Sequence, residues 1–358
     1  MPEKVYFAPI EGSVREFNFE GKLKKLFSAA GLDKVFSPDE LVAVKIHFGE
    51  KGNTGHIAPK HTGYIINEIR RRRGKPFLTD TTTLYRGQRG NAVDHLALAD
   101  EHGYNFRNCG APLVIADGLR GQSGVAIKIK GKHFRQAHIA SEFAHADAMI
   151  TLSHATGHIG TGFACALKNL GMGCASRGGK RAQHSHMRPQ ADRLKCTACG
   201  ECVKWCPENA IKLVKKKKKV AQINAKKCIG CGQCFSVCRF SAIEFDWGNM
   251  GRDLQERIAE YALAAAAALG GKVGYINFLT RITESCDCMG IDEPRIVPDI
   301  GLVAGRDPVA VDAASYDLIA ERNGDVFKEL YPDFEVRDQF THAEKIGLGT
   351  SKYKIIKV

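Results

Sequence analysis

One cysteine spacing occurs twice in this 358-residue chain, and it constrains the fold more than any other feature. CTACGECVKWCP at 196–207 and CIGCGQCFSVCR at 228–239 both contain C-x2-C-x2-C-x3-C. In such a loop, three thiolates bind one iron–sulfur cube while the fourth cysteine points to a second cube. The spacing therefore predicts two 4Fe-4S clusters with crossed ligand sets: Cys196, Cys199, Cys202 and Cys238 for one cluster, and Cys228, Cys231, Cys234 and Cys206 for the other.

The stretch between the two motifs supports this prediction. Residues 208–227, ENAIKLVKKKKKVAQINAKK, indicate a helical turn and then two strands joined by a turn, with the lysine run 215–219 at its tip. Two four-cysteine zinc sites would use the same ligands, but the doubled spacing with the intervening Ala-Ile is more typical of clusters. Arg239 stands where such motifs usually carry proline, as at Pro207. A cation there should make the nearby cluster easier to reduce.

Length and cysteine content narrow the class of protein. A chain of this length exceeds the size of most single cores, so we expect one large domain and a smaller module. No apolar run approaches the ~18 residues of a membrane span, and the first residues lack the apolar segment of a secretion signal. We therefore expect a cytoplasmic protein with no membrane partner. Thirteen cysteines in that compartment favour metal ligation or redox chemistry over disulfides, and an anaerobic source would fit.

The charge of the chain favours acidic partners. It carries 52 Lys and Arg against 39 Asp and Glu, a formal net charge of +13. Such a balance suits anionic substrates, acidic proteins or nucleic acid. A lysine run is usually only solvated surface, but beside clusters it would attract an acidic ferredoxin or flavodoxin-type electron donor or acceptor. Nucleic acid is the less favoured partner, because the run lacks interleaved aromatic residues.

Outside the cysteine-rich stretch, the chain alternates apolar strands with helical stretches. Helices are expected at 61–74, 251–271 and 306–324. The sequence predicts an α/β fold, formed by residues 1–190 and 247–358, that is interrupted at 191–246 by an inserted α+β ferredoxin-like domain. Near-continuous apolar runs, which suit a mostly parallel sheet with helices on both faces, occur at 41–48, 76–80, 111–117, 147–154, 272–279 and 296–305.

Polar and glycine-rich loops follow several of these strands. In open α/β sheets, ligands bind outside the carboxyl ends of the strands. The glycine spacing in 155–162 does not match a dinucleotide fingerprint, so plain turn geometry is the alternative to anion binding. His154 and His158 are favoured as hydrogen-bonding residues over a metal pair. The candidate binding residues at the strand ends are Lys45, His47, Asp80, Thr81, His154 and His158.

A second group of candidates lies in GMGCASRGGKRAQHSHMRP, residues 171–189. Its cationic side chains suit a clamp for phosphate or carboxylate. A solvated linker into the inserted module is the alternative. The residues concerned are Arg177, Lys180 and His184.

Several stretches together resemble a known family. VAVKIHFGEKGNTG, LTDTTTLYRGQRG, SHATGHIGTGFACALKNLGMGCASRGGK and CDCMG with VPDIGLVAGRDPVAVD are similar to the family called domain of unknown function 362, whose members often carry a two-cluster ferredoxin segment. The resemblance covers nearly the whole chain and implies no substrate. Cys165 stands where a small residue is expected, and we interpret it as a packed core thiol. The family positions that the resemblance implies are Lys45, His47, His158, Lys168, Asn169, Arg177, Lys180 and Asp312.

A further cysteine pair lies in ESCDCMG, residues 284–290. In an extended segment, Cys286 and Cys288 would have Cβ atoms ~6 to 7 Å apart, too far for a disulfide, whereas two thiolates can lean toward a shared ion. We therefore predict a third metal or redox centre, with Cys174 as a third ligand and Asp287 or a histidine completing the set. Buried unligated thiols and a reducible cysteine pair are the alternatives.

These features together predict an iron–sulfur oxidoreductase. Its two clusters would relay low-potential electrons to an anionic substrate or cofactor in the α/β crevice. The alternative is a non-catalytic ferredoxin-like electron carrier or a protein that handles iron–sulfur clusters or metals. Flavin is not excluded, because flavin sites often lack a sequence fingerprint.

Overall fold

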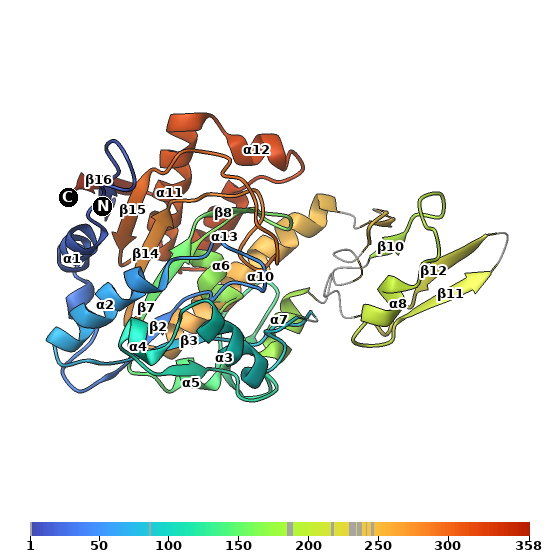
Figure 1. Cartoon of the computed structure of the whole chain (residues 1–358), viewed down its shortest axis with the longest axis horizontal. Coiled ribbons are helices and arrows are strands. Elements are labelled where there is room, and N and C mark those ends of the chain that lie inside the picture. Colours follow the sequence, from blue (N-terminus) through green and yellow to red (C-terminus); the bar gives the residue numbers. More distant parts are fainter. Residues whose placement is uncertain are drawn as a thin grey trace.

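A single large sheet forms the centre of the protein (Figure 1). The computed structural model describes residues 2–85, 87–184, 189–215, 218–228, 234, 238–240, 242–244 and 247–358. The sheet has eight strands in the order β16-β1-β15-β14-β7-β2-β3-β4. Their bounds are β1 Glu3–Pro9, β2 Leu41–Lys45, β3 Lys75–Asp80, β4 Leu113–Ile115, β7 Ala148–His154, β14 Val273–Leu279, β15 Gly301–Gly305 and β16 Tyr353–Lys357.

Most neighbouring strands in this sheet are parallel. The exceptions are the two pairs that β15 makes with β1 and with β14, which are antiparallel. The other five pairs are parallel. The predicted α/β fold with a mostly parallel sheet is therefore confirmed. All six predicted strands are present, with β2, β4 and β15 shorter than expected, while β1 and β16 were not predicted.

Helices cover both faces of the sheet, because alternate residues of each buried strand enter two different apolar cores. On β14, Tyr275 belongs to one core and its neighbour Ile276 to the other. Residues of α6 (Ala166–Gly171), α10 (Trp247–Ala268), α11 (Pro308–Asn323) and α13 (Arg337–Lys345) pack in the first core. Residues of α1 (Phe19–Ala29), α2 (Pro59–Arg71) and α3 (Ala92–Glu101) pack in the second.

Smaller elements complete this α/β body. Two short antiparallel hairpins, β5–β6 and β8–β9, lie outside the main sheet. No helix among the described residues is long and apolar enough to cross a membrane. The bounds of these smaller elements are η1 Leu32–Lys34, α4 Phe106–Cys109, β5 Gly124–Lys128, β6 Gln136–Ala140, α5 Ser141–Ala144, β8 Thr156–His158, β9 Gly162–Ala164, α7 Arg177–His184 and α12 Val326–Leu330.

The cysteine-rich segment stands beside the α/β body (Figure 1). It contains α8 (Glu201–Trp205) and two antiparallel strand pairs, β10 (Gln190–Ala191) with β13 (Ile243–Glu244) and β11 (Ile211–Lys215) with β12 (Lys219–Ile223). Its apolar side chains and cysteines form a third core, separate from the other two. The two strands expected between the cysteine motifs are thus present. Cys231, Lys216 and Lys217 lie outside the described residues.

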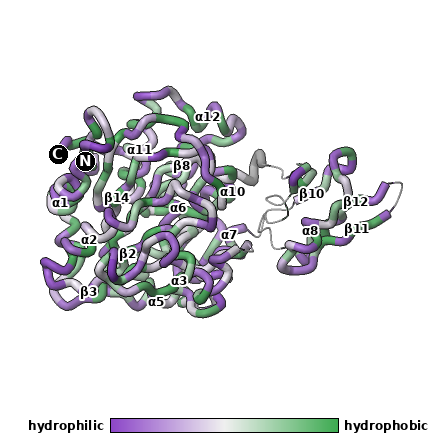
Figure 2. The backbone as a smooth tube through the Cα atoms, viewed as in Figure 1, coloured by the Kyte–Doolittle hydropathy of each residue, from purple (hydrophilic) through white to green (hydrophobic). Residues whose placement is uncertain are grey.

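Two helices of the body flank this segment in the sequence. α7 ends at His184, and α10 begins at Trp247. Figure 1 shows the segment on the side of the body where these two helices lie. Figure 2 shows that the outer ends of β11 and β12, near the lysine run, are hydrophilic.

Candidate functional site

A cavity of about 230 Å³ lies at the carboxyl ends of the central parallel strands. β2, β3 and β7 end at Lys45, Asp80 and His154, and all three residues line the cavity. The carboxyl ends of parallel strands meet at one edge of a sheet, which is why residues so distant in sequence come together. Helices α6, α7 and α10, the β8–β9 hairpin and the loops after β3 and β14 supply further parts of the wall.

The cavity brings together most of the residues predicted from the sequence. Two of the predicted residues, Arg177 and Cys174, are not among the described residues that line the cavity. The Arg177 guanidinium instead donates to the Gly90 carbonyl oxygen at 3.3 Å. The buried Cys174 sulfur lies 3.9 Å from Met149 Sδ in the first apolar core, away from the cysteine pair for which we expected it as a ligand. The predicted residues that do line the cavity are Lys45, His47, Asp80, Thr81, His154, His158, Lys168, Asn169, Lys180, His184, Cys286 and Cys288.

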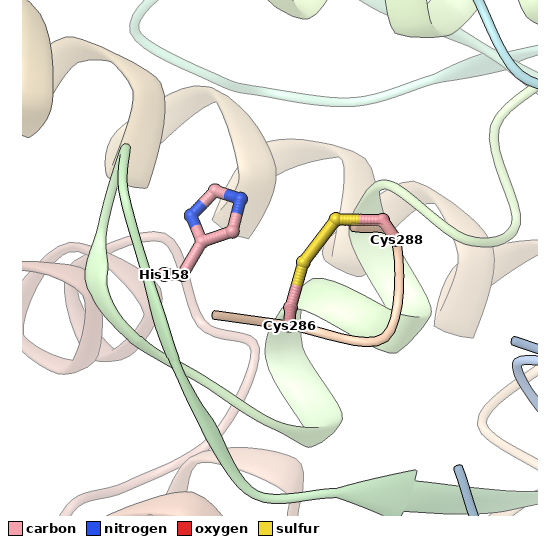
Figure 3. Close-up of side chains that lie close together, drawn as sticks. All are labelled: His158, Cys286 and Cys288. Carbon is pink, nitrogen blue, oxygen red and sulfur yellow. A yellow bond between two sulfur atoms is a disulfide. The ribbon is translucent and has the colours of Figure 1, made fainter. Parts of the chain in front are cut away.

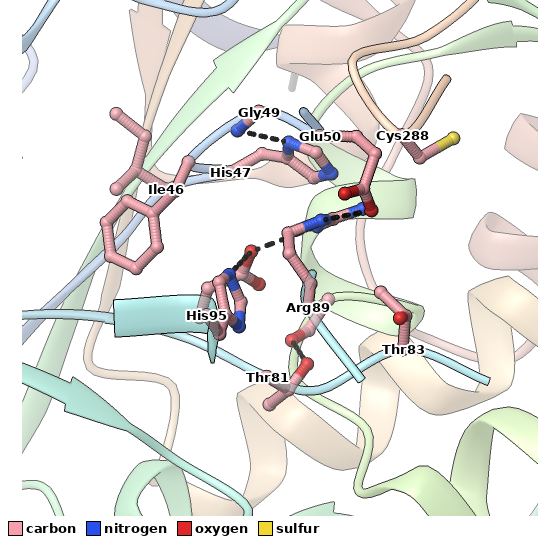
Figure 4. A network of polar contacts seen from close by, with 12 residues as sticks. Ile46, His47, Gly49, Glu50, Thr81, Thr83, Arg89, His95 and Cys288 are labelled. Atoms are coloured by element: carbon pink, nitrogen blue, oxygen red, sulfur yellow. Dashed lines mark hydrogen bonds and ion pairs between the residues drawn. The ribbon is translucent and has the colours of Figure 1, made fainter. Parts of the chain in front are cut away.

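A buried network of charges forms one side of the cavity (Figure 4). Asp80 lies 3.0 Å from Lys45 Nζ and 3.5 Å from Arg89 Nη1, and Arg89 Nε lies 3.2 Å from Glu50. Burial raises the pKa of Asp80, but the charges of Lys45, His95 and Arg89 together lower it by more. The net shift of the Asp80 pKa is therefore downward. The carboxylate therefore stays ionised. Arg89 and Glu50 were not predicted; Arg89 lies in the LYRGQRG stretch that contributes to the family resemblance.

Lys180 of α7 contributes a further buried cation. Its ammonium group donates to Thr81 Oγ1, to the Thr82 carbonyl oxygen at 2.8 Å and to the Ala175 carbonyl oxygen at 3.1 Å. Burial lowers the pKa of Lys180 to about 8. All these partners are uncharged, so the charge of this ammonium group is not neutralised by them.

Helix α6 places Lys168 and Asn169 in the wall. Its first two N–H groups, of Ala166 and Leu167, each donate to the Asp312 carboxylate at 2.8 Å, which fixes the start of the helix. Asn169 Oδ1 accepts from Lys45 Nζ at 2.7 Å. Burial lowers the pKa of Lys168 to about 7. Asp312, a family position by resemblance, thus acts on the site by holding α6.

Three of the four histidines that line the cavity differ in their protonation. His154 Nδ1 lies 3.0 Å from both oxygens of Asp287, and Nε2 lies 2.8 Å from the Thr280 carbonyl oxygen. Burial lowers the pKa of His154, but Asp287 raises it more, which favours the imidazolium. For His47 and His158, burial and neighbouring cations lower the pKa well below its usual value. Both are therefore neutral imidazoles.

Cys286 and Cys288 are joined by a disulfide in the cavity wall, with Cα atoms 5.3 Å apart (Figure 3). The extended geometry expected for this segment was wrong, because the Met289 N–H donates to the Cys286 carbonyl oxygen at 2.9 Å and closes a turn. Lys168 Nζ lies 3.1 Å from Cys286 Sγ and 3.8 Å from Cys288 Sγ. A ring nitrogen of His158 and the two sulfurs all lie within 4.8 Å of one another.

A second, smaller cavity lies in the cysteine-rich segment. The Cys196 and Cys238 sulfurs accept from the Ala221 and Ala242 N–H groups at 3.5 and 3.2 Å. The pKa of Cys202 is raised to about 11, mainly by burial and to a smaller extent by the neighbouring thiols of Cys196, Cys199 and Cys238. The cysteines that line this cavity are the four that spacing assigns to one cluster: Cys196, Cys199, Cys202 and Cys238.

The second predicted ligand set is described only in part. Cys206 is buried, and its sulfur accepts from the Ala210 N–H at 3.2 Å. Cys234 is buried and Cys228 is half-buried. Cys231, the remaining member, lies outside the described residues.

Comparison with known proteins finds one family and distant structural neighbours. The family model described as "Domain of unknown function (DUF362)" matches residues 42–317. No curated protein matches the chain. The lactate racemase apoprotein from Thermoanaerobacterium thermosaccharolyticum is 12% identical, with a TM-score of 0.41 over 78% of this chain and 51% of that chain. A Thermotoga maritima protein from a structural genomics consortium is 9% identical, with a TM-score of 0.41 over 85% of this chain and 58% of that chain. This chain thus spans between half and three fifths of the length of either neighbour.

Proposed function

The chain belongs to the DUF362 family, and we propose that it is an iron–sulfur oxidoreductase that acts on an anionic substrate in the cavity at the carboxyl ends of the strands. One observation carries this proposal. A segment with two four-cysteine motifs lies between α7 and α10, and both helices contribute to the cavity wall, through His184 and Leu254. The chain therefore joins the segment directly to two helices of the cavity wall, which favours electron transfer from the segment to the cavity.

The cysteine-rich segment fits a cluster. Four sulfurs surround one space, and backbone N–H groups already donate to two of them, those of Cys196 and Cys238. Four thiolates around one space would repel one another without a cationic partner, and iron would supply that charge. Amide hydrogen bonds to the sulfurs also favour the more negative, reduced state. A bound 4Fe-4S cluster supplies one-electron transfer at low potential.

The cavity fits an anionic substrate. Lys45 and Arg89 are paired with Asp80 and Glu50, whereas the contacts described for Lys180 are with neutral oxygens. The charges of Asp117 and Asp80 act on Lys180 without a direct ion pair, so a carboxylate or phosphate would supply a contacting negative charge and further favour the protonated ammonium group.

A neutral imidazole in the same wall is suited to proton transfer. His47 Nδ1 accepts from the Gly49 N–H at 3.0 Å, so its proton resides on Nε2. Reduction of most organic substrates consumes protons as well as electrons, and a positioned imidazole can supply one. A pure electron carrier has no use for such a cavity, and this favours an enzyme over the alternative.

The first test is the metal content of the anaerobically reconstituted full chain. We expect about eight irons and eight sulfides, with visible absorption that dithionite bleaches. Cys202→Ser should retain about four irons, because it removes one ligand of one cluster. Cys109→Ser, which alters a free thiol packed in the second apolar core, should retain all eight. Protein that binds two zinc ions and is colourless would refute the clusters.

The second test separates an enzyme from a carrier. Small molecules released from anaerobically purified protein are identified by mass spectrometry and returned to the dithionite-reduced chain. We expect one of them to be turned over, with a KM that rises in Lys180→Met while the iron content stays unchanged. A chain that transfers electrons equally well with and without Lys180, and transforms no released compound, is a carrier.

The lysine run provides a prediction about the electron partner. Changing Lys215, Lys218 and Lys219 together with the two lysines between 215 and 218 to glutamine should slow reduction by an acidic ferredoxin or flavodoxin at low salt. The slowing should shrink as salt increases, because screening removes the attraction in the wild type too. Stopped-flow reduction at two ionic strengths measures this. Equal rates for the two proteins at low salt would show that the run is only a solvated turn.

A further inference from the structure

We propose that Cys286, Cys288 and His158 form a binding site for a thiophilic divalent cation such as Zn²⁺, and that this site is available only after the disulfide has been reduced. The three residues come from two loops of the cavity wall (Figure 3). Their ligand atoms lie within 4.8 Å of one another, which is close enough to contact a common ion. The site is distinct from the eight motif cysteines, so the proposal does not depend on the proposed clusters.

His158 is prepared as a ligand by its own contacts. Its Nδ1 lies 2.9 Å from Thr161 Oγ1, and that hydroxyl donates its own hydrogen to the Phe163 carbonyl oxygen, so it can accept from a protonated Nδ1. Cation binding at the other nitrogen requires this tautomer, in which the 3.2 Å hydrogen bond that Nδ1 accepts from the Gly160 N–H is given up. These contacts orient the ring, and Figure 3 shows the other nitrogen pointing toward the cysteine pair. A metal-binding histidine almost always donates its second ring N–H to such an acceptor. His154, by contrast, has both nitrogens occupied by Asp287 and Thr280, so it is not a ligand.

Reduction converts the pair into a ligand set. A dithiol reductant supplies two electrons and two protons, the bond between the Cys286 and Cys288 sulfurs breaks, two thiols form, and the reductant becomes a disulfide. Binding of the cation then displaces the two thiol protons to solvent and forms two metal–sulfur bonds and one metal–nitrogen bond. While the disulfide is intact, neither sulfur is a thiolate, and the site lacks two of its three ligands.

The surroundings suit a reactive centre better than a structural one. Three protein ligands leave one tetrahedral position open, as in catalytic zinc sites, and here all three ligands line the large cavity. Lys168, 3.1 Å from Cys286 Sγ, would offset thiolate charge while no cation is bound. A substrate anion held by the cavity lysines could then reach the fourth position, which would polarise it.

The test measures zinc uptake by the full chain, isolated anaerobically with its native metal content. One sample is treated with dithiothreitol, which is then removed by anaerobic gel filtration, and a second sample is left untreated. Both receive zinc, excess zinc is removed, and zinc and iron are counted by mass spectrometry. We expect about one more zinc per chain in the reduced sample than in the untreated one.

Variants show where this zinc binds. Cys286→Ser/Cys288→Ser should abolish the additional zinc, His158→Gln should weaken its binding tenfold or more, and Cys109→Ser should leave it unchanged. Equal zinc in reduced and untreated wild type, or in reduced wild type and the double serine variant, would overturn the proposal. The difference between these two proteins does not depend on cluster content. Failure of the proposed function would instead appear as missing iron in all samples.

Discussion

Replacing Asp80 by asparagine should lower the free energy of unfolding of the α/β body by about 3 to 5 kcal/mol. Asp80 is buried between the Lys45 ammonium, at 3.0 Å, and the Arg89 guanidinium, at 3.5 Å. Removal of the carboxylate charge leaves the buried Lys45 without its carboxylate partner, while Arg89 keeps Glu50. An unpaired charge in a buried site costs far more than the loss of an exposed pair.

Hydrogen exchange of the amides in β2 and β3 measures this change, because those strands end at Lys45 and Asp80. Asp39→Asn is the matched control. Asp39 pairs with Arg73 at 2.8 Å, but both side chains are more than half exposed, so the loss should stay below about 1 kcal/mol. If Asp80→Asn and Asp39→Asn lower the free energy of unfolding by the same small amount, the prediction is wrong. Water would then reach the buried network and replace the Asp80 carboxylate as the partner of the cations.

The strands that the sequence predicted are those buried on both faces. Residues of β7 and β14 are buried almost without interruption, because helices cover both sides of the parallel part of the sheet. β16, YKIIK, is an edge strand of mixed exposure, and β1 begins with exposed charged residues. From sequence alone, such segments cannot be distinguished from loops. The antiparallel direction of β15 has no local signal either, since it depends on the path of the chain between distant elements.

The site followed from topology more than from any single motif. Lys45, Asp80 and His154 could be predicted because parallel strands end at one edge of the sheet. Arg89 could not, because its loop folds back onto Asp80 without a recognisable pattern. The cysteine pair was placed correctly in the crevice, but its turn and its proximity to His158 depend on backbone contacts that spacing does not reveal.

Replacing Asp312 by alanine should destabilise α6 by about 3 kcal/mol or more. The buried carboxylate accepts from the N–H groups of Ala166 and Leu167 and from Asn277 Nδ2, at 2.7 to 2.8 Å. Each buried donor that loses its acceptor costs about 1 to 3 kcal/mol. Hydrogen exchange of the α6 amides measures the loss. Because Lys168 and Asn169 lie on this helix, the cavity wall should be disturbed with it.

The size of this effect should depend on pH, since burial raises the pKa of Asp312 to about 6 from an ordinary value of 3.8. The folded protein then binds a proton more tightly than the unfolded chain does, so this contribution to stability is complete below about pH 4 and is lost as the pH rises through 6. Between pH 5 and pH 7.5 the free energy of unfolding of the wild type should therefore fall by about 1.4 kcal/mol relative to that of Asp312→Ala.

Asn18→Ala is the matched control, because Asn18 caps α1 through the Gly21 N–H at 2.9 Å and does not titrate. Its effect should be the same at both pH values. A difference between wild type and Asp312→Ala that is also independent of pH would mean that the two N–H groups and Asn277 stabilise the ionised carboxylate enough to offset its burial.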